Sequence, residues 1–116
     1  MEKKTVARPR REQLEAIRRA MEEAAHAVGV PLAQVYLFGS QARGEADDKS
    51  DWDFLVIVRG ELSWEAHRRL FCEISQRLAK LGVPADLVIR TERQVTEALQ
   101  RLVSVEKTAL QEGVPL

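Results

Sequence analysis

The sequence predicts an α/β fold of the α+β type, in which helices pack on a small mixed β-sheet of three or more strands. Segments whose apolar residues recur at spacings of three and four alternate with short runs of β-branched and aromatic residues, which favour helices and strands respectively. The tripeptide Gly-Val-Pro also follows two of the helical segments, at residues 29–31 and 82–84. A glycine after a helix, followed closely by proline, ends that helix and favours an extended segment.

The first part of the chain is predicted to form a long helix, a strand and a short helix. The long helix runs from about Arg10 to Val28 and is followed by a strand from about Gln34 to Phe38. The apolar stripe of the long helix consists of Leu14, Ile17, Met21, Ala24, Ala25 and Val28. Ser40 is expected to cap a short helix over residues 41–43 that ends at Gly44.

The middle of the chain is predicted to form a buried strand and a second long helix. The strand extends from about Asp51 to Arg59, and the helix is capped by Ser63 and reaches about Lys80. The apolar stripe of this helix consists of Trp64, His67, Leu70, Phe71, Ile74, Leu78 and Leu81. His67 is read as a histidine at the edge of the core, with a general base as the alternative.

A third strand and a last helix complete the predicted fold. The strand runs from about Ala85 to Arg90, and a capping box over residues 91–94 starts a helix that continues to about Glu112. Leu99, Leu102, Val103 and Val105 cannot all face one core from a single helix. This helix therefore lies in a groove between two layers, or it offers a surface to a partner or to a second copy of the chain.

Composition limits the classes of protein to be considered. The 116 residues are 45% hydrophobic and are expected to form one domain over residues 1–116, with residues 1–9 flexible. Because 18 basic residues balance 18 acidic ones, we do not expect direct binding to nucleic acid. The charged start and the lack of a long apolar run predict a cytoplasmic protein without a membrane span. The single Cys72 fits a reducing compartment and is expected in the core.

Gly39 and Ser40 form a candidate phosphate site directly after the first predicted strand. Glycine lets the backbone turn sharply and approach a ligand closely, and a helix start with free N–H groups attracts anions. A serine hydroxyl beside those groups strengthens the interpretation. A capped turn that binds nothing is the alternative, because such turns are common.

Asp51 and Asp53 form a candidate metal site at the start of the second predicted strand. The two-residue period of a strand places both carboxylates on one face, where they repel each other. A divalent cation would offset this repulsion, and Mg²⁺ prefers a few carboxylates together with phosphate oxygens. A solvated turn is the alternative. Asp86, near the start of the third strand, could add a third carboxylate if the two strands are neighbours, or could be a strand-edge acid without a role.

Taken together, Gly39, Ser40, Asp51, Asp53 and Asp86 resemble the pattern of polymerase-β-type nucleotidyltransferases, and of the minimal nucleotidyltransferases in particular. The resemblance covers about residues 32–90 and includes the Ala-Arg-Gly at residues 42–44. It implies the nucleotidyltransferase fold and a reaction in which an acceptor hydroxyl attacks the α-phosphorus of a nucleoside triphosphate, here ATP, and releases pyrophosphate.

The resemblance also implies a role for each matching residue. Gly39 and Ser40 would hold the β- and γ-phosphates, Asp51 and Asp53 would bind two Mg²⁺ ions, and Asp86 would share one ion and help to deprotonate the acceptor. Arg43 could contact the phosphates, as could Lys49, although each could equally be a solvated charge.

A small helical protein of the HEPN type is the partner that the resemblance implies, in a toxin–antitoxin pair whose nucleotidyltransferase adds AMP to the toxin. Because the 116 residues are expected to form one domain, we do not expect an acceptor-binding domain within them. Two alternatives stay open. The chain could be a binding module that neutralises its partner without chemistry, or a catalytic subunit that modifies a small-molecule hydroxyl.

Overall fold

The structure is a computed structural model that describes residues 11–45 and 50–116. Its elements follow in the order α1 (Arg11–Val28), β1 (Leu32–Phe38), α2 (Ser40–Arg43), β2 (Trp52–Val58), α3 (Trp64–Lys80), β3 (Ala85–Thr91), α4 (Glu92–Ala98), α5 (Val105–Glu112) and β4 (Val114–Pro115). Among these residues, no helix is long and apolar enough to cross a membrane. The predicted α+β fold with a mixed sheet is confirmed, and the predicted flexibility of residues 1–9 lies outside the described residues.

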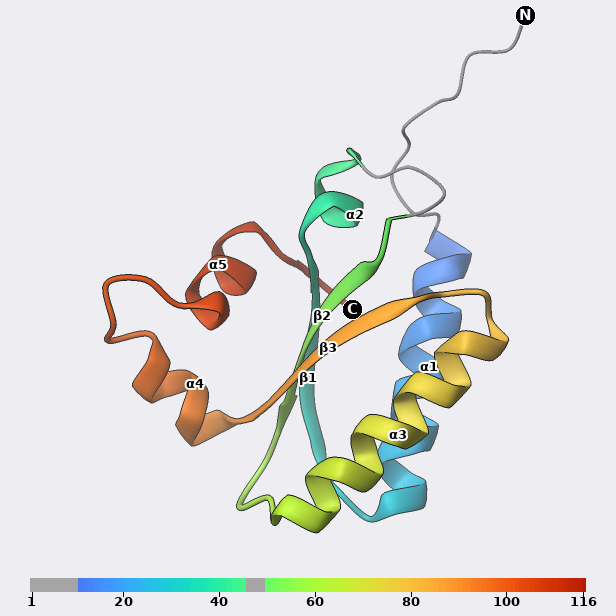
Figure 1. Ribbon diagram of the computed structural model, residues 1–116, viewed down its shortest axis with the longest axis horizontal. Helices are drawn as coiled ribbons and strands as arrows, with labels where there is room; N and C mark the ends of the chain where they lie inside the picture. Colours follow the sequence, from blue (N-terminus) through green and yellow to red (C-terminus); the bar gives the residue numbers. More distant parts are fainter. Residues whose placement is uncertain (1–10, 46–49) are drawn as a thin grey trace, which may run out of the picture.

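The sheet has four strands in the order β3-β2-β1-β4 and is mixed in direction. β2 runs antiparallel to β1 and parallel to β3, and the short β4 runs antiparallel to β1. The C-terminal end of β1 therefore meets the N-terminal ends of β2 and β3 at one end of the sheet. In Figure 1, α2 lies at this end.

Helices cover both faces of the sheet, as Figure 1 shows with α1 and α3 on one side and α4 and α5 on the other. The larger core lies under α1 and α3, where alternate β2 residues such as Phe54, Val56 and Val58 are fully buried. On the other face of β2, Leu55 and Ile57 pack with Val95 of α4 and Ala109 of α5. Burial on both faces explains the near-continuous apolar run of β2.

The last predicted helix is two helices, and this part of the prediction is wrong. α4 starts at the predicted capping box, in which the Thr91 and Gln94 side chains each accept a hydrogen bond from the other's backbone N–H. It ends at Ala98, and α5 starts after Ser104, whose hydroxyl accepts a hydrogen bond from the Lys107 N–H at 3.0 Å. Leu102 and Val103 lie between the helices and are 94% and 83% exposed, so they do not lie in a groove between layers.

A third Gly-Val-Pro, at residues 113–115, enters a strand as well as ending a helix. Val114 and Pro115 pair with Leu37 and Tyr36 of β1, and the Leu116 N–H donates to the Val35 carbonyl at 2.9 Å. The sequence pattern predicts only the helix stop, and the strand comes from this pairing. β1 is also longer than predicted, because it begins at Leu32.

Part of the predicted stripe of α3 is exposed. Leu70, Ile74 and Leu78 are fully buried, whereas Trp64 is 76% exposed and stacks under the Arg68 guanidinium. Cys72, predicted in the core, is exposed. Because α3 packs mainly against α1 and β3, a narrow apolar stripe suffices for its burial.

Candidate active site

Asp51, Asp53 and Asp86 come together at the end of the sheet where β2 and β3 begin. Asp53 and Asp86 are direct partners in the parallel register, and Asp51 precedes β2 by one residue. Asp51 and Asp86 are exposed, and Asp53 is half-buried. The second and third strands are therefore neighbours, which is the condition under which Asp86 joins the pair.

The residues between the acids fix the direction of the carboxylates. Trp52 is buried in the larger core, where its ring stacks on Phe54 with the ring centres 6.3 Å apart. The Trp52 N–H also donates to the Pro84 carbonyl at 2.8 Å, which sets the start of β2 against the start of β3. Because side chains alternate along a strand, Asp51 and Asp53 lie on the opposite face, under which α4 and α5 pack.

Gly39 lies against Asp53 because β1 ends opposite the start of β2. Phe38 is the register partner of Asp53, and the next residue, Gly39, has a φ of 77°. A Cβ atom built on Gly39 would collide with the Asp53 carboxylate. This position therefore needs glycine for two reasons, the left-handed backbone and the space that the carboxylate occupies.

The short helix α2 follows this turn, with one difference from the prediction. Gly39 is its N-cap residue, Ser40 is its first residue, and no side-chain hydrogen bond caps it. The predicted end at Gly44, in the left-handed conformation, is correct. The Ser40 hydroxyl is thus not used as a helix cap, and its predicted role toward phosphate stays a prediction.

Gln41 connects α2 to the acids, a role that the sequence does not predict. Its side chain is buried, and its Nε2 donates to the Ser50 carbonyl at 3.4 Å, directly before Asp51. A buried polar side chain between two charged motifs is hard to recognise in a sequence, because the contact depends on the fold of the intervening residues.

The charges at this end of the sheet act on one another. Burial raises the pKa of Asp53 above its ordinary value, and the neighbouring carboxylates of Asp86 and Asp51 raise it further, whereas Arg43 lowers it. Among the described residues, the charges that act on Asp53 are therefore the carboxylates of Asp51 and Asp86 and the guanidinium of Arg43. Such a cluster of like charges is typical of functional sites, although structural clusters also occur.

Arg43 is held by two carboxylates. Its Nε donates to Glu45 at 2.7 Å, and its Nη1 donates to Glu112, the last residue of α5, at 3.1 Å. The predicted contact of Arg43 with phosphate is not tested by these interactions. Lys49, the other candidate cation, lies outside the described residues.

The three carboxylates at this end of the sheet are ligands that suit a hard cation. Carboxylate oxygens are the ligands that Mg²⁺ prefers, and Mg²⁺ is commonly held by one or two carboxylates together with phosphate and water. Among the described residues, no group of three or more His, Cys, Asp or Glu side chains is arranged so that it could hold a metal ion by itself. Binding of two Mg²⁺ ions by Asp51, Asp53 and Asp86 stays a prediction, which rests on their chemistry and on their common position.

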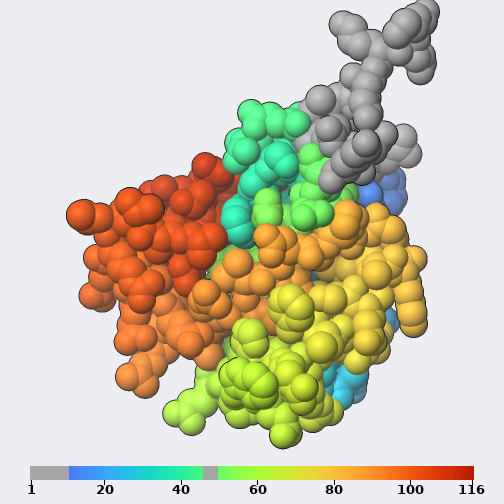
Figure 2. Space-filling model, viewed as in Figure 1, coloured from blue at the N-terminus to red at the C-terminus, as the bar shows by residue number. Residues whose placement is uncertain are grey.

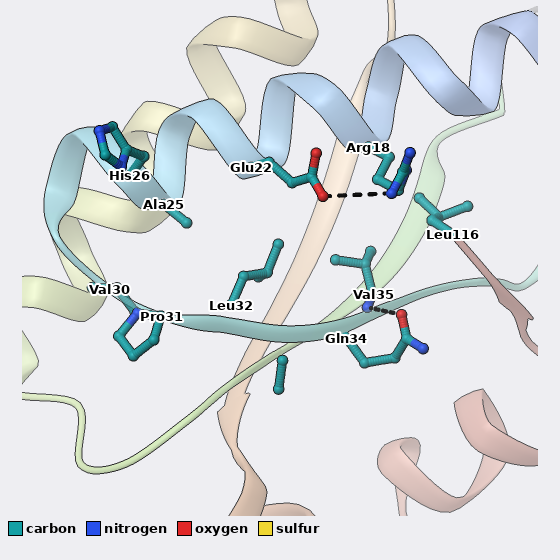
Figure 3. Close-up of a pocket in the computed structure, with 11 residues that line it drawn as sticks. Arg18, Glu22, Ala25, His26, Val30, Pro31, Leu32, Gln34, Val35 and Leu116 are labelled. Atoms are coloured by element: carbon teal, nitrogen blue, oxygen red, sulfur yellow. Dashed lines mark hydrogen bonds and ion pairs between the residues drawn. The ribbon is translucent and has the colours of Figure 1, made fainter.

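A separate pocket of about 480 Å³ lies between α1 and β1, as Figure 3 shows. Arg18, Glu22, His26 and Gln34 contribute its polar lining, and the Arg18 and Glu22 side chains form an ion pair across 3.5 Å. None of the predicted site residues lines this pocket.

The comparisons with known proteins agree with this geometry. The model of the family described as Polymerase beta, Nucleotidyltransferase matches residues 29–111. A structure described as a minimal nucleotidyltransferase is 31% identical, with 90% of this chain and 94% of that chain covered and a TM-score of 0.59. No protein of curated function matches the chain significantly.

Two less similar structures share the fold. A protein from Sulfolobus solfataricus, described as a nucleotidyltransferase, is 22% identical over 92% of this chain and 87% of its own, with a TM-score of 0.50. A toxin–antitoxin structure with AMP-PNP is 20% identical over 84% of this chain and 69% of its own, with a TM-score of 0.54. Because the family model covers most of the chain, from the turn before β1 to the last turn of α5, the chain belongs to the polymerase β nucleotidyltransferase family.

Proposed function

We propose that the chain is a magnesium-dependent nucleotidyltransferase that transfers AMP from ATP to a hydroxyl group of a partner protein. The observation that carries this proposal is the position of Asp53, between the Gly39 turn on one side and Asp86 on the other. A phosphate-binding turn beside carboxylates is the arrangement that nucleotidyl transfer requires, because the triphosphate must be held against its metal ligands.

The residues have the following proposed roles. The Gly39 backbone and the Ser40 hydroxyl bind the β- and γ-phosphates, and Arg43 adds positive charge at the same helix. Asp51 and Asp53 hold Mg²⁺, and Asp86 shares one ion. When bound, the ions neutralise charge on the phosphates and on the leaving pyrophosphate. The oxygen of the acceptor hydroxyl bonds to the α-phosphorus while the bond between the α-phosphorus and pyrophosphate breaks. Asp86 accepts the proton that the hydroxyl loses.

A helical protein of the HEPN type is the proposed acceptor, with this chain as the antitoxin-like subunit of a two-protein system. The similar structure described as a toxin–antitoxin with AMP-PNP, an analogue of ATP, supports a toxin as the partner and an adenine nucleotide as the substrate. The exposed Leu102 and Val103 offer apolar surface on the molecule for such a partner.

Intact-mass spectrometry of the co-purified partner, after incubation with the chain, Mg²⁺ and ATP, tests this proposal. We expect the partner to gain one or more AMP units, and we expect no gain with Asp51→Asn or Asp53→Asn. Glu22→Gln is the control, because it removes one negative charge from α1 on the other face of the sheet. Transfer at the wild-type rate by both Asp variants would contradict the proposed metal site.

A binding module without catalysis is the second candidate, and the exposed apolar residues between α4 and α5 favour it. In that case the partner forms a stable complex whose mass does not change, and neutralisation survives the loss of Asp51 and Asp53. A partner that binds without gaining mass, together with a labelled small molecule in the same reaction, would instead indicate a small-molecule acceptor.

A further inference from the structure

We infer that Glu112 is a positioning residue for Arg43, and that through it the C-terminal segment sets the affinity of the site for the triphosphate. This inference rests on the proposed function, because it concerns how the same site holds its nucleotide. It starts from the contact between the Arg43 Nη1 and the Glu112 carboxylate, which spans 69 residues of sequence and 3.1 Å in space.

The segment that carries Glu112 is fixed to the strand before the phosphate turn. Gly113 fits so closely that a Cβ atom there would collide with the Ala109 carbonyl and approach the Leu37 carbonyl to 3.2 Å. Val114 then pairs with Leu37, two residues before Gly39. The backbone on the C-terminal side of Glu112 is therefore in register with β1.

The other end of α5 is fixed to the strand that carries Asp86. Glu106 is buried, and its carboxylate accepts a hydrogen bond from the Arg90 Nε at 2.9 Å. Arg90 lies four residues after Asp86 on the same face of β3, because side chains alternate along a strand. α5 thus connects the strand of the third acid, through Glu106, with the phosphate helix, through Glu112.

Figure 2 shows the result of these contacts at the surface, where the red atoms of α5 lie beside the blue-green atoms of α2. Glu45 binds the Nε of Arg43 from within the same loop, whereas Glu112 binds Nη1 from a separate, anchored element. The Glu112 contact links the guanidinium to a second element of the fold, whereas Glu45 lies only two residues from Arg43 and adds no such link. Arg43 is close enough to the acids to lower the pKa of Asp53, so the position of its guanidinium affects the charge of the site.

Two opposite effects of Glu112 on nucleotide binding can be distinguished. If Glu112 positions Arg43, removal of its carboxylate weakens binding of the triphosphate. If it is only a nearby negative charge, its removal strengthens binding, because the ligand is an anion. Glu112→Gln separates the two, since it removes the charge and keeps an oxygen that can accept from Arg43.

Isothermal titration calorimetry of the full chain with AMP-PNP and MgCl2 tests the inference. We expect Glu112→Ala to raise Kd by about twofold to fivefold, the range for a partly exposed charge pair. Glu112→Gln is expected to stay near the wild-type Kd, and the effect of Glu112→Ala is expected to vanish in an Arg43→Ala background. Glu22→Ala, which removes an Arg-paired carboxylate of similar exposure from α1, is the matched control.

The outcomes separate this inference from the proposed function. If the wild type binds AMP-PNP and Glu112→Ala leaves Kd unchanged or lowers it, the positioning role is wrong while the proposed function stands. An effect of Glu112→Ala that persists without Arg43 would also overturn the role. If the wild type does not bind AMP-PNP with Mg²⁺, the proposed function and the inference fail together.

Discussion

Asp53 is the residue on which the most constraints meet. Its backbone pairs with Phe38 on one side and with Asp86 on the other, and its carboxylate fills the space beside Gly39. Ionisation at this position is costly, because the side chain is partly desolvated and two other carboxylates are close. Such a cost in stability is what a role of the ionised carboxylate in metal binding, as proposed, would entail.

The pH dependence of stability follows from this cost. The raised pKa means that the folded state holds the Asp53 proton more tightly than the unfolded state does. Asp53 therefore destabilises the fold as pH rises from below its ordinary value of 3.8 through the raised value. Without Mg²⁺, we expect Asp53→Asn to have a higher Tm than the wild type at pH 7 and no advantage near pH 3. A lower Tm of the variant at pH 7 would show that ionised Asp53 stabilises the fold.

Gly39 gives a second prediction at the scale of one residue. In Gly39→Ala, the new Cβ atom would sit on a left-handed backbone and collide with the Asp53 carboxylate. We therefore expect the free energy of unfolding in urea to fall by about 2–4 kcal/mol, and we expect nucleotide transfer to be lost. Gly60→Ala is the matched control, since Gly60 has a similar φ of 72° and a Cβ atom there would meet nothing within 4 Å. It is expected to cost only about 1–2 kcal/mol and to keep transfer. Equal effects of the two variants would contradict the close approach of Gly39 to Asp53.

At the scale of elements, an ion pair between Glu106 of α5 and Arg90 of β3 joins these two elements. The Glu106 side chain is 6% exposed and the Arg90 side chain is 36% exposed. Removal of either partner therefore leaves the other charge in a different environment. Arg90→Ala leaves a buried carboxylate unpaired, and we expect it to cost about 3–4 kcal/mol in urea unfolding. Glu106→Ala leaves a guanidinium that water can reach, and we expect about 1–2 kcal/mol. The opposite order would show that the carboxylate reaches solvent when its partner is removed.

The elements also show how far the sequence determines the fold. The apolar run of β2 and the Gly-Val-Pro stops predict where the strands lie along the sequence. Parallel and antiparallel pairing of β2 and β3 both stay open in the sequence, and the structure shows the parallel pairing, which suits a connection through α3. The break between α4 and α5 is not predicted, because a helical pattern of apolar residues continues across it. Ser104, followed by acidic Glu106, is the available signal for a new helix start.

In the segment between α4 and α5, we predict a substitution with almost no effect on stability. Because Leu102 is 94% exposed, we expect Leu102→Ser to change the unfolding free energy by less than about 0.5 kcal/mol. Leu70→Ala, at a fully buried position of α3, should cost about 2–5 kcal/mol in the same urea titration. A large cost for Leu102→Ser would mean that this segment packs on the molecule.

For the whole molecule, the sheet collects residues that are distant in sequence at one of its ends. The Gly39 turn, Asp51 with Asp53, and Asp86 belong to three different strand ends, and the strand order β3-β2-β1 makes them neighbours. The sequence predicts that Asp51 and Asp53 share a face, but it places Asp86 beside them only if their strands are neighbours, and the pairing of β2 with β3 supplies that condition. The link from Glu112 to Arg43 could not be predicted, because it depends on how α5 crosses the sheet and on the pairing of β4 with β1.

The central claim is that this end of the sheet binds the metal and the nucleotide. Its most direct test is the paramagnetic broadening of backbone amide signals when Mn²⁺, in place of Mg²⁺, is added with AMP-PNP to the full chain. We expect broadening to centre on Gly39, Asp53 and Asp86, to spare Arg18 and His26 at the pocket between α1 and β1, and to disappear in Asp53→Asn. Broadening that centres elsewhere, or that is unchanged in Asp53→Asn, would contradict a metal and nucleotide site at this end of the sheet.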